Sequence, residues 1–248
     1  MKAELIDHMG DDLTVVNAAR VSFDKESDWE EVSGWSFSNN EEPKRIPPVS
    51  LVLPDKDKKL VNYLAKHNHW TPFSHAMITM RETVPIFVAR QRFKHTVGFT
   101  YNEVSRRYVD DEPEFFIPTK WRKRAENKKQ GSSDEEVKLG FVRVIPHNSE
   151  AYSTDVYQNA LNTCYDAYVS MLKSGVAPEQ ARMVLPQSMY TSYYVTGSLA
   201  AWARAYKLRS DKNSQAEISE LAEMWSDIIK PLFPHSWEAL TNATQRPN

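Results

Sequence analysis

Several features are scarce in this chain, and each absence excludes a class of protein. Cys164 is the single cysteine among 248 residues, so an internal disulfide and a metal site built from several thiolates are both excluded. Only seven glycines occur, and the sequence contains neither G-x-G-x-x-G nor G-x-x-x-x-G-K-S/T. A bound nucleotide would therefore have to be held by side chains instead of a glycine-rich phosphate loop.

Long apolar runs and a strong net charge are also missing. No run of about 18 apolar residues occurs, and residues 1–10 lack the apolar centre of a signal peptide. We therefore expect a soluble, cytoplasmic protein with no membrane partner. Lys and Arg total 31 against 33 Asp and Glu, a balance that argues against a general nucleic-acid coat and makes any basic stretch a local feature.

Regular elements are predicted from hydrophobic periodicity. Helices are expected at 11–19, 58–66, 86–93, 153–174, 199–208 and 214–229, and strands at 76–83 and 189–196. Residues 24–57 are polar and are expected to be an inserted surface segment, and residues 120–146 are strongly charged and are expected to be a second insertion or a mobile loop. Helices and strands do not alternate regularly, so we predict an α+β fold in one domain over residues 1–248, with a central, mostly antiparallel sheet flanked by helices.

Cationic side chains are concentrated in the segment 85–108, among aromatic and small polar residues. They are Arg90, Arg92, Arg106 and Arg107, together with Lys94 and His95. Such a density of fixed donors favours an anion site, whereas the alternative is a solvated helix face followed by a charged loop. Glu103, Ser105 and Arg107 are spaced by two, so a strand or an extended loop would place all of them on one side, where they could converge on one ligand.

Arginines elsewhere in the chain could join this segment. Arg182 and Arg209 each carry a planar guanidinium suited to a phosphate or an imide edge. The alternatives are an exposed helix residue for Arg182 and a helix C-terminal cap for Arg209.

Other candidate chemistry is less well supported. His67, His69 and His75, with His95, could bind a metal, but they lack the i, i+4 spacing of common zinc sites and have no carboxylate nearby in sequence, so no metal is predicted. Ser105 lacks the G-x-S-x-G elbow of a nucleophile and is expected to hydrogen-bond a ligand. Cys164 lies on the apolar face of the helix 153–174, which favours a structural thiol.

Ordered segments spread over the chain resemble the flavin-dependent thymidylate synthases, which methylate dUMP with FAD. The matching segments are 9–13, 18–23, 69–75, 85–91, 102–108, 181–186, 190–191 and 208–211, with Gln215 and Glu217. The chain departs from that family in its Arg-His-Arg triplet, which is Lys94-His95-Thr96 here and is followed by eight residues, not seven, before Ser105. Lysine keeps a point charge but loses the bidentate fork of arginine.

Further departures lie outside the triplet. Ser74 stands where the family usually has Glu, and Ser198, Ala200 and Arg204 stand where it often has Asn, Arg and Asn. Arg204 lies one helical turn from Ala200 and could replace the charge missing there.

The resemblance implies a set of site residues and partners. The residues expected at dUMP, with their cationic neighbours, are Arg90, Gln91, Lys94, Glu103, Ser105, Arg106, Arg107, Arg182 and Arg209. Those expected at FAD are Ser22, Thr71, Lys94, His95, Thr96, Glu103, Ser198 and Arg204. The resemblance also implies methylenetetrahydrofolate and NADPH as cosubstrates and a homotetramer with shared active sites.

The same resemblance implies a mechanism without an enzyme nucleophile. Arg209 is the expected catalytic residue, because a fixed guanidinium at the N3/C4 edge of uracil would stabilise the anion that develops when C5 reacts. Two alternatives stay open. One is a single-stranded nucleic-acid binding module that stacks bases on Phe93, Phe99, Tyr101 and Tyr108. The other is a family member that binds nucleotide but is inactive.

Overall fold

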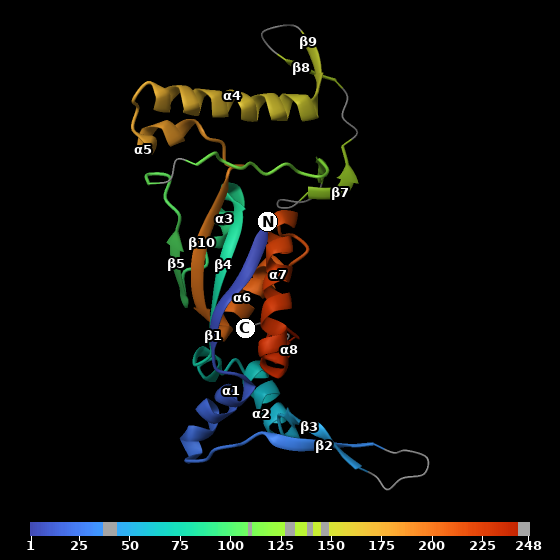
Figure 1. The fold of residues 1–248 in the computed structure, drawn as a ribbon. Helices are drawn as coiled ribbons and strands as arrows, with labels where there is room; N and C mark the ends of the chain where they lie inside the picture. The colour runs from blue at the N-terminus through green and yellow to red at the C-terminus, as the bar shows by residue number, and fades with distance from the viewer. Residues whose placement is uncertain (37–43, 109–110, 127–131, 138–140, 145–148, 243–248) are drawn as a thin grey trace.

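A four-stranded antiparallel sheet forms the centre of the molecule (Figure 1). The computed structural model describes residues 1–36, 44–108, 111–126, 132–137, 141–144 and 149–242. The sheet order is β1 (Lys2–Met9), β4 (Met77–Pro85), β10 (Tyr190–Ser198) and β5 (Phe99–Glu103), and every neighbouring pair is antiparallel. The predicted α+β class and antiparallel sheet are confirmed.

The two faces of this sheet differ in burial. On β4, Ile78, Met80, Glu82 and Val84 are fully buried, as expected for one face of a strand with a side-chain period of two. The opposite face carries polar and exposed side chains, among them Arg81 and the hydrogen-bonded pair Thr79 and Thr196. Met9 and Tyr194 on that face are 57% and 48% exposed, so the sheet has one packed face and one open face.

Helices cover the buried face. They are α3 (Ile86–Arg92), α6 (Leu199–Arg209), α7 (Ala216–Leu232) and α8 (Pro234–Asn242). The predicted helix at 214–229 is confirmed, because Ile218, Leu221, Ala222, Trp225 and Ile229 recur at helical spacing and are all fully buried. Gln215 and not Ser214 occupies the N-cap, and the helix continues through Pro231 to Leu232.

The N-terminal segment packs against the end of the chain. Asp11 caps α1 (Asp12–Arg20) through a reciprocal capping box with Thr14. The carboxylate of Asp12 accepts hydrogen bonds from the backbone N–H groups of His235 and Ser236 at 2.9 and 2.8 Å, at the start of α8. The short 3-10 turns η1 (Val21–Phe23) and η2 (Pro72–Ser74) and the helix α2 (Asp55–Lys66) complete this end of the molecule (Figure 1).

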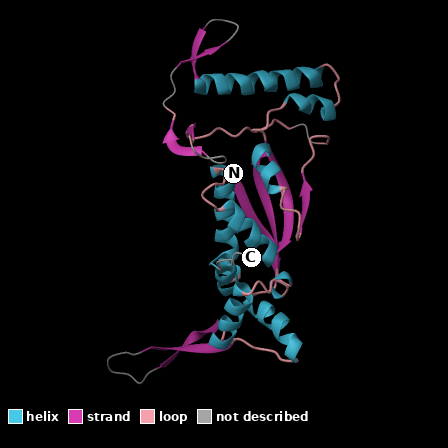
Figure 2. Cartoon of the chain, turned by 180° about the vertical axis from the view of Figure 1, so that it is seen from behind, coloured by secondary structure: helices cyan, strands magenta, loops and turns pink. Residues whose placement is uncertain are grey.

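Both predicted insertions contain hairpins. The first, within 24–57, forms β2 (Glu30–Ser36) and β3 (Lys44–Val52), which project from the body of the protein (Figure 2). Within 120–146, β6 (Arg122–Arg124) pairs with β7 (Ser132–Glu136). A second pair, β8 (Phe141–Val144) with β9 (Ser149–Tyr152), begins in this insertion and ends just beyond it. Among the residues that the structure describes in 120–146, part of the segment is therefore paired as strands.

The long helix α4 (Ser153–Lys173), α5 (Pro178–Ala181) and the 3-10 turn η3 (Arg182–Val184) lie across one end of the sheet (Figure 1). The long helix was predicted at 153–174, and Leu161 and Tyr168 are its buried apolar positions. Among the described residues, no helix has both the length and the apolar character needed to cross a membrane.

Candidate active site

A cavity of about 730 Å³ lies where the end of β5 meets η3 and the start of β10. Four of the residues predicted at dUMP line it, namely Glu103, Ser105, Arg106 and Arg182. Glu103 accepts a hydrogen bond from the hydroxyl of Thr191 at 2.6 Å, and Arg106 donates to the backbone carbonyl of Asp111. The cavity also has Asp111, Glu112 and Glu114 in its wall, so an anionic ligand would have to lie at its arginine end.

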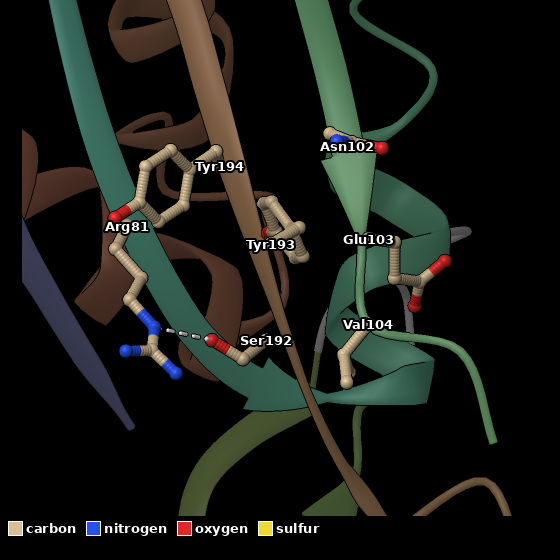
Figure 3. A pocket seen from close by; sticks show the side chains of 7 residues that line it. All are labelled: Arg81, Asn102, Glu103, Val104, Ser192, Tyr193 and Tyr194. Atoms are coloured by element: carbon tan, nitrogen blue, oxygen red, sulfur yellow. Dashed lines mark hydrogen bonds between the residues drawn. The ribbon is translucent and has the colours of Figure 1, made fainter. Parts of the chain in front are cut away.

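A smaller cavity of about 240 Å³ adjoins the larger one, and the two share Glu103, Val104 and Ser192. Figure 3 shows Arg81 pointing along the open face of the sheet, where its Nε donates to Ser192 Oγ at 3.0 Å. Together, the two cavities lie on the β5–β10 edge of the sheet and combine polar and apolar side chains.

Arg107 and Arg182 meet at a common residue. Arg107 Nε donates to Glu179 Oε2 at 3.0 Å, and Arg182 Nε donates to the backbone carbonyl of Glu179 at 3.3 Å. The ion pair is half exposed, at 52% for both side chains, so it contributes little stability and either arginine can turn to a ligand. Of the two alternatives for Glu103, Ser105 and Arg107, a continuous strand is wrong, because β5 ends at Glu103, residues 104 and 105 are irregular, and a turn follows at 106–108.

A second cluster joins α3 to the end of α6. Arg209 Nε donates to His95 Nε2 at 2.8 Å, and Arg209 Nη2 donates to the backbone carbonyl of Gln91 at 3.1 Å. Arg209 is therefore held at two of its nitrogens, with its remaining N–H groups available to a ligand. Arg90 and Lys94 are exposed beside this cluster.

The electrostatics of this cluster keep His95 neutral. Burial, followed by the positive charges of Arg209, Arg92 and Arg204, lowers the pKa of His95 to about 4. A neutral imidazole can accept a hydrogen bond at Nε2, which a protonated one cannot. Burial and the charge of Arg92 also lower the pKa of Arg209, although a guanidinium remains charged at any working pH. His95 is thus an acceptor that orients the Arg209 cation.

Arg92 does not belong to the surface anion site that the sequence suggested. Arg92 is fully buried and forms an ion pair with the equally buried Glu82, with Arg92 Nε 3.2 Å from both carboxylate oxygens. Its guanidinium carbon lies 4.4, 4.7 and 4.6 Å from the ring centroids of Phe99, Trp202 and Trp225. This network was missed, although a carboxylate at Glu82, in phase with Ile78 and Met80 on a strand, is a sequence signal for a buried charge.

The buried network touches the surface cluster through one hydroxyl. Arg92 Nη1 donates to the Tyr101 hydroxyl at 2.6 Å, and that hydroxyl donates to the backbone carbonyl of His95 at 2.7 Å. Phe93, Phe99 and Tyr101 pack against the core, so they are not free to stack bases. Of the aromatic residues proposed for nucleic-acid stacking, Tyr108 is the exposed one, at 81%.

Most residues predicted at FAD gather where residues 94–98 cross α6. Gly98 has φ +79° and lies against Ala201, where an added Cβ would come within 2.9 Å of the Ala201 side chain. Ser198 is the N-cap of α6, with its hydroxyl accepting from Ala201 N at 3.3 Å, and Arg204 donates to the backbone carbonyl of Val97. Lys94 and Thr96 are exposed, so this place presents two cations and solvent-facing polar groups, which fit a pyrophosphate.

The remaining predicted residues lie at other places. Ser22 in η1 and Thr71 just before η2 are exposed at the α1 end of the molecule. Glu103 stands at the far end of β5 from Ser198, because Phe99 is opposite Gly197 and Glu103 is opposite Tyr193; four residues of strand span about 13 Å. Within the described residues, no hydrogen bond or ion pair joins the Arg209 cluster to the Glu103 cavity.

The alternative metal site gains no support from this arrangement. Tyr63, His67 and His69 form a ring cluster with centroids 4.3 to 6.4 Å apart. In the described part of the chain, no group of three His, Cys, Asp or Glu side chains could hold a metal ion. Cys164 is half-buried on α4 and forms no disulfide.

Known proteins resemble this chain over most of its length. Residues 4–235 match the family model described as thymidylate synthase complementing protein. The flavin-dependent thymidylate synthase of Thermosipho africanus is 34% identical over 95% of this chain and 88% of that protein, and the one from Thermotoga neapolitana is 34% identical over 95% and 88%.

A solved structure has the same fold. The crystal structure of the UMP/dUMP methylase PolB from Streptomyces cacaoi bound with 5-Br dUMP matches with a TM-score of 0.69 and 27% identity, over 97% of this chain and 94% of that one. By its family model and its relatives, the chain belongs to the thymidylate synthase complementing protein family, which includes the flavin-dependent thymidylate synthases.

Proposed function

We propose that this protein catalyses the reductive methylation of dUMP to dTMP, using FAD, methylenetetrahydrofolate as one-carbon donor and NADPH as reductant. The observation that carries the proposal is the placement of Arg209, whose guanidinium is held by the neutral His95 and by the Gln91 carbonyl at the junction of α3 and α6. Family membership supports the reaction class, and this geometry supplies the residue that would perform the protein's part of it.

Arg209 is proposed to act on the uracil ring. Carbon C5 becomes nucleophilic only when electron density moves into the ring, and negative charge then develops at the N3/C4 edge. A guanidinium already fixed in position stabilises that charge without reorganising, which is the largest contribution that most active sites make. Since Arg209 uses Nε and one N–H of Nη2 for His95 and Gln91, the N–H groups of Nη1 remain for the substrate.

The flavin site proposed here centres on the crossing of residues 94–98 with α6. Lys94 and Arg204 would neutralise the pyrophosphate, and Thr96 and Ser198 would donate hydrogen bonds to it. When bound, FAD supplies the redox chemistry of the reaction. Lys94 in place of arginine keeps the charge but offers no bidentate contact, so we expect flavin affinity to depend strongly on ionic strength.

Assembly into a homotetramer is part of the proposal. The open face of the sheet exposes Met9 and Tyr194, and a neighbouring subunit would cover it. Such an arrangement would let the cavity of Glu103 and Arg182 in one subunit meet the Arg209 cluster of another. The nucleotide residues that form two groups in a single chain would then contact one dUMP molecule.

The test follows the release of the C5 proton of dUMP, labelled with tritium, with FAD, NADPH and methylenetetrahydrofolate supplied. We expect release by the native protein and its loss in Arg209→Ala, with tetramer and flavin content unchanged. An inactive nucleotide-binding protein would bind dUMP without releasing tritium. A nucleic-acid module would bind neither FAD nor dUMP, and its binding to single strands would weaken steeply with salt.

A further inference from the structure

A line of hydrogen bonds connects the second insertion to Gln91. Arg122, on β6, donates from Nη2 to both carboxylate oxygens of Glu217 at 2.7 and 2.8 Å, and from Nε to Ser132 Oγ on β7 at 2.7 Å. The two charged side chains are only 20% and 9% exposed. The hairpin β6–β7 is thus fixed to the first turn of α7 by a largely buried charge pair.

The line continues from Glu217 towards the site. Gln215 Nε2 donates to Glu217 Oε2 at 2.8 Å, and Gln91 Nε2 donates to Gln215 Oε1 at 2.7 Å. Gln91 is the residue whose backbone carbonyl also accepts from Arg209. Four side chains from β6, α7, its N-cap and α3 are therefore joined in series.

The charged pair of Arg122 and Glu217 fixes which group donates and which accepts in each hydrogen bond of this line. Arginine can only donate and an ionised carboxylate can only accept. Burial alone would raise the pKa of Glu217, but hydrogen bonds from Arg122 and Gln215 outweigh it and lower that pKa, so the group is ionised. Gln215 must therefore donate an amide N–H to Glu217, which turns its side-chain carbonyl towards Gln91. Gln91 must then donate its own side-chain N–H to that carbonyl. The carbonyl oxygen of Gln91 is left as an acceptor for a ligand.

We propose that Arg122 is a positioning residue for the nucleotide site, acting through Glu217 and Gln215 to fix the orientation of the Gln91 amide. This inference rests on the proposed function and on the expectation, from the family resemblance, that the side chain of Gln91 contacts dUMP. It gives the insertion at 120–146 a part in substrate binding, because the insertion supplies the cation that holds Glu217. If Arg122 is lost, Glu217 and Gln215 can rotate and the Gln91 amide can present either end to the substrate.

A merely structural Arg122, one that anchors the hairpin and nothing else, makes a different prediction. Its removal would lower the unfolding temperature and leave dUMP affinity unchanged. We call the line of hydrogen bonds from Arg122 through Glu217 and Gln215 to Gln91 the relay. The positioning proposal requires that dUMP affinity change when the relay is broken, whether or not the β6–β7 hairpin is destabilised.

The experiment measures the dissociation constant of dUMP by calorimetry on the flavin-loaded protein. We expect Arg122→Leu to weaken dUMP binding by about tenfold, the equivalent of one well-formed hydrogen bond at 1.4 kcal/mol for each factor of ten. Arg122→Lys should restore part of the affinity, since it keeps the charge. Arg124→Leu is the matched control, because Arg124 is an exposed arginine of the same short strand, and its dUMP affinity should match that of the native protein.

A double-mutant cycle separates action through Gln91 from a diffuse effect. In a Gln91→Ala background, Arg122→Leu should change dUMP affinity less than about twofold, because the relay no longer has an end to position. If Arg122→Leu leaves affinity unchanged, or weakens it equally in both backgrounds, the proposal is overturned.

A second variant covers the case in which Arg122→Leu does not fold. Gln215→Leu leaves the Arg122–Glu217 pair intact and breaks the relay, so it should weaken dUMP binding by a similar factor, and native affinity there would also overturn the proposal. A native protein that neither binds dUMP nor releases its C5 proton would instead refute the proposed function.

Discussion

Replacing Arg92 with methionine tests the charge network beneath the site. Arg92 and Glu82 are both fully buried, and Glu82 also accepts a hydrogen bond from the Tyr193 hydroxyl at 2.5 Å. Methionine would fill much of the space among Phe99 and the tryptophans without carrying a charge. In the Arg92→Met variant, Glu82 would keep the Tyr193 hydroxyl as a donor but lose its counter-ion.

The expected cost follows from these contacts. Removing one partner of a buried ion pair destabilises a protein by about 3–5 kcal/mol, because the other charge is left uncompensated. Loss of the contacts between the cation and the aromatic rings adds about 0.5–2 kcal/mol. One nitrogen of Arg92, Nη2, has no hydrogen-bond partner among the described residues, and relief of that unmet donor offsets about 1 kcal/mol. We therefore expect a net loss of about 4 kcal/mol.

Urea unfolding followed by tryptophan fluorescence measures this loss, at one fixed protein concentration because assembly shifts apparent stability. The matched control is the double variant Arg92→Met/Glu82→Gln, in which the buried charge is gone and the amide oxygen still accepts from Tyr193. It should be more stable than Arg92→Met by at least about 1 kcal/mol. A loss below about 1 kcal/mol in the single variant, or equal losses in both, would refute this account of the network.

Three further changes have defined outcomes. Burial and the charge of Arg209 lower the pKa of His95 from 6.5 to about 4. Between these two pH values the unfolded state binds more protons than the folded state, so the free energy of unfolding should fall as pH falls from about 6.5 to about 4. His95→Gln should flatten that slope in unfolding experiments. An added Cβ at Gly197 would overlap the Phe99 ring, so Gly197→Ala should lower stability by about 1–3 kcal/mol in thermal unfolding. Cys164→Ser, on a half-buried position of α4, should retain turnover in the tritium-release assay; loss of activity with fold and flavin intact would contradict a mechanism without an enzyme nucleophile.

Elements with strong internal periodicity could be predicted from the sequence. The helices at 153–174 and 214–229 repeat apolar residues at helical spacing, and the segment 76–83 alternates. The strand at 189–196 could be predicted from its aromatic and β-branched residues. Strand β1 was missed because the alternation of Lys2 to Leu5 breaks at Ile6, where the strand has a register shift between Leu5 and Asp7. The β2–β3 hairpin was missed because Pro47 and Pro48 lower the strand propensity of β3.

The sequence indicated which residues are candidates for the site, but it did not indicate which of them contact one another. Arg90 and Arg92 look alike in sequence, but two residues of helix turn the side chain by about 200°, so Arg90 is exposed while Arg92 is buried. The relay from Arg122 to Gln91 includes partners 95 and 124 residues apart. Only the folded chain brings such residues together, and no local pattern encodes the pairing.

Asp12 has a consequence for the order in which the protein can form. Its carboxylate binds the start of α8, 223 and 224 residues later in the chain. Strand β4 likewise has only one edge paired until β10 is present. Contacts of such sequence separation require large loops to close before they contribute stability, which makes folding slow. A growing chain therefore cannot form the contact between Asp12 and α8 until nearly all of it has been synthesised. Deleting α8 should destabilise α1 at the other end of the sequence, because Asp12 would lose both backbone partners.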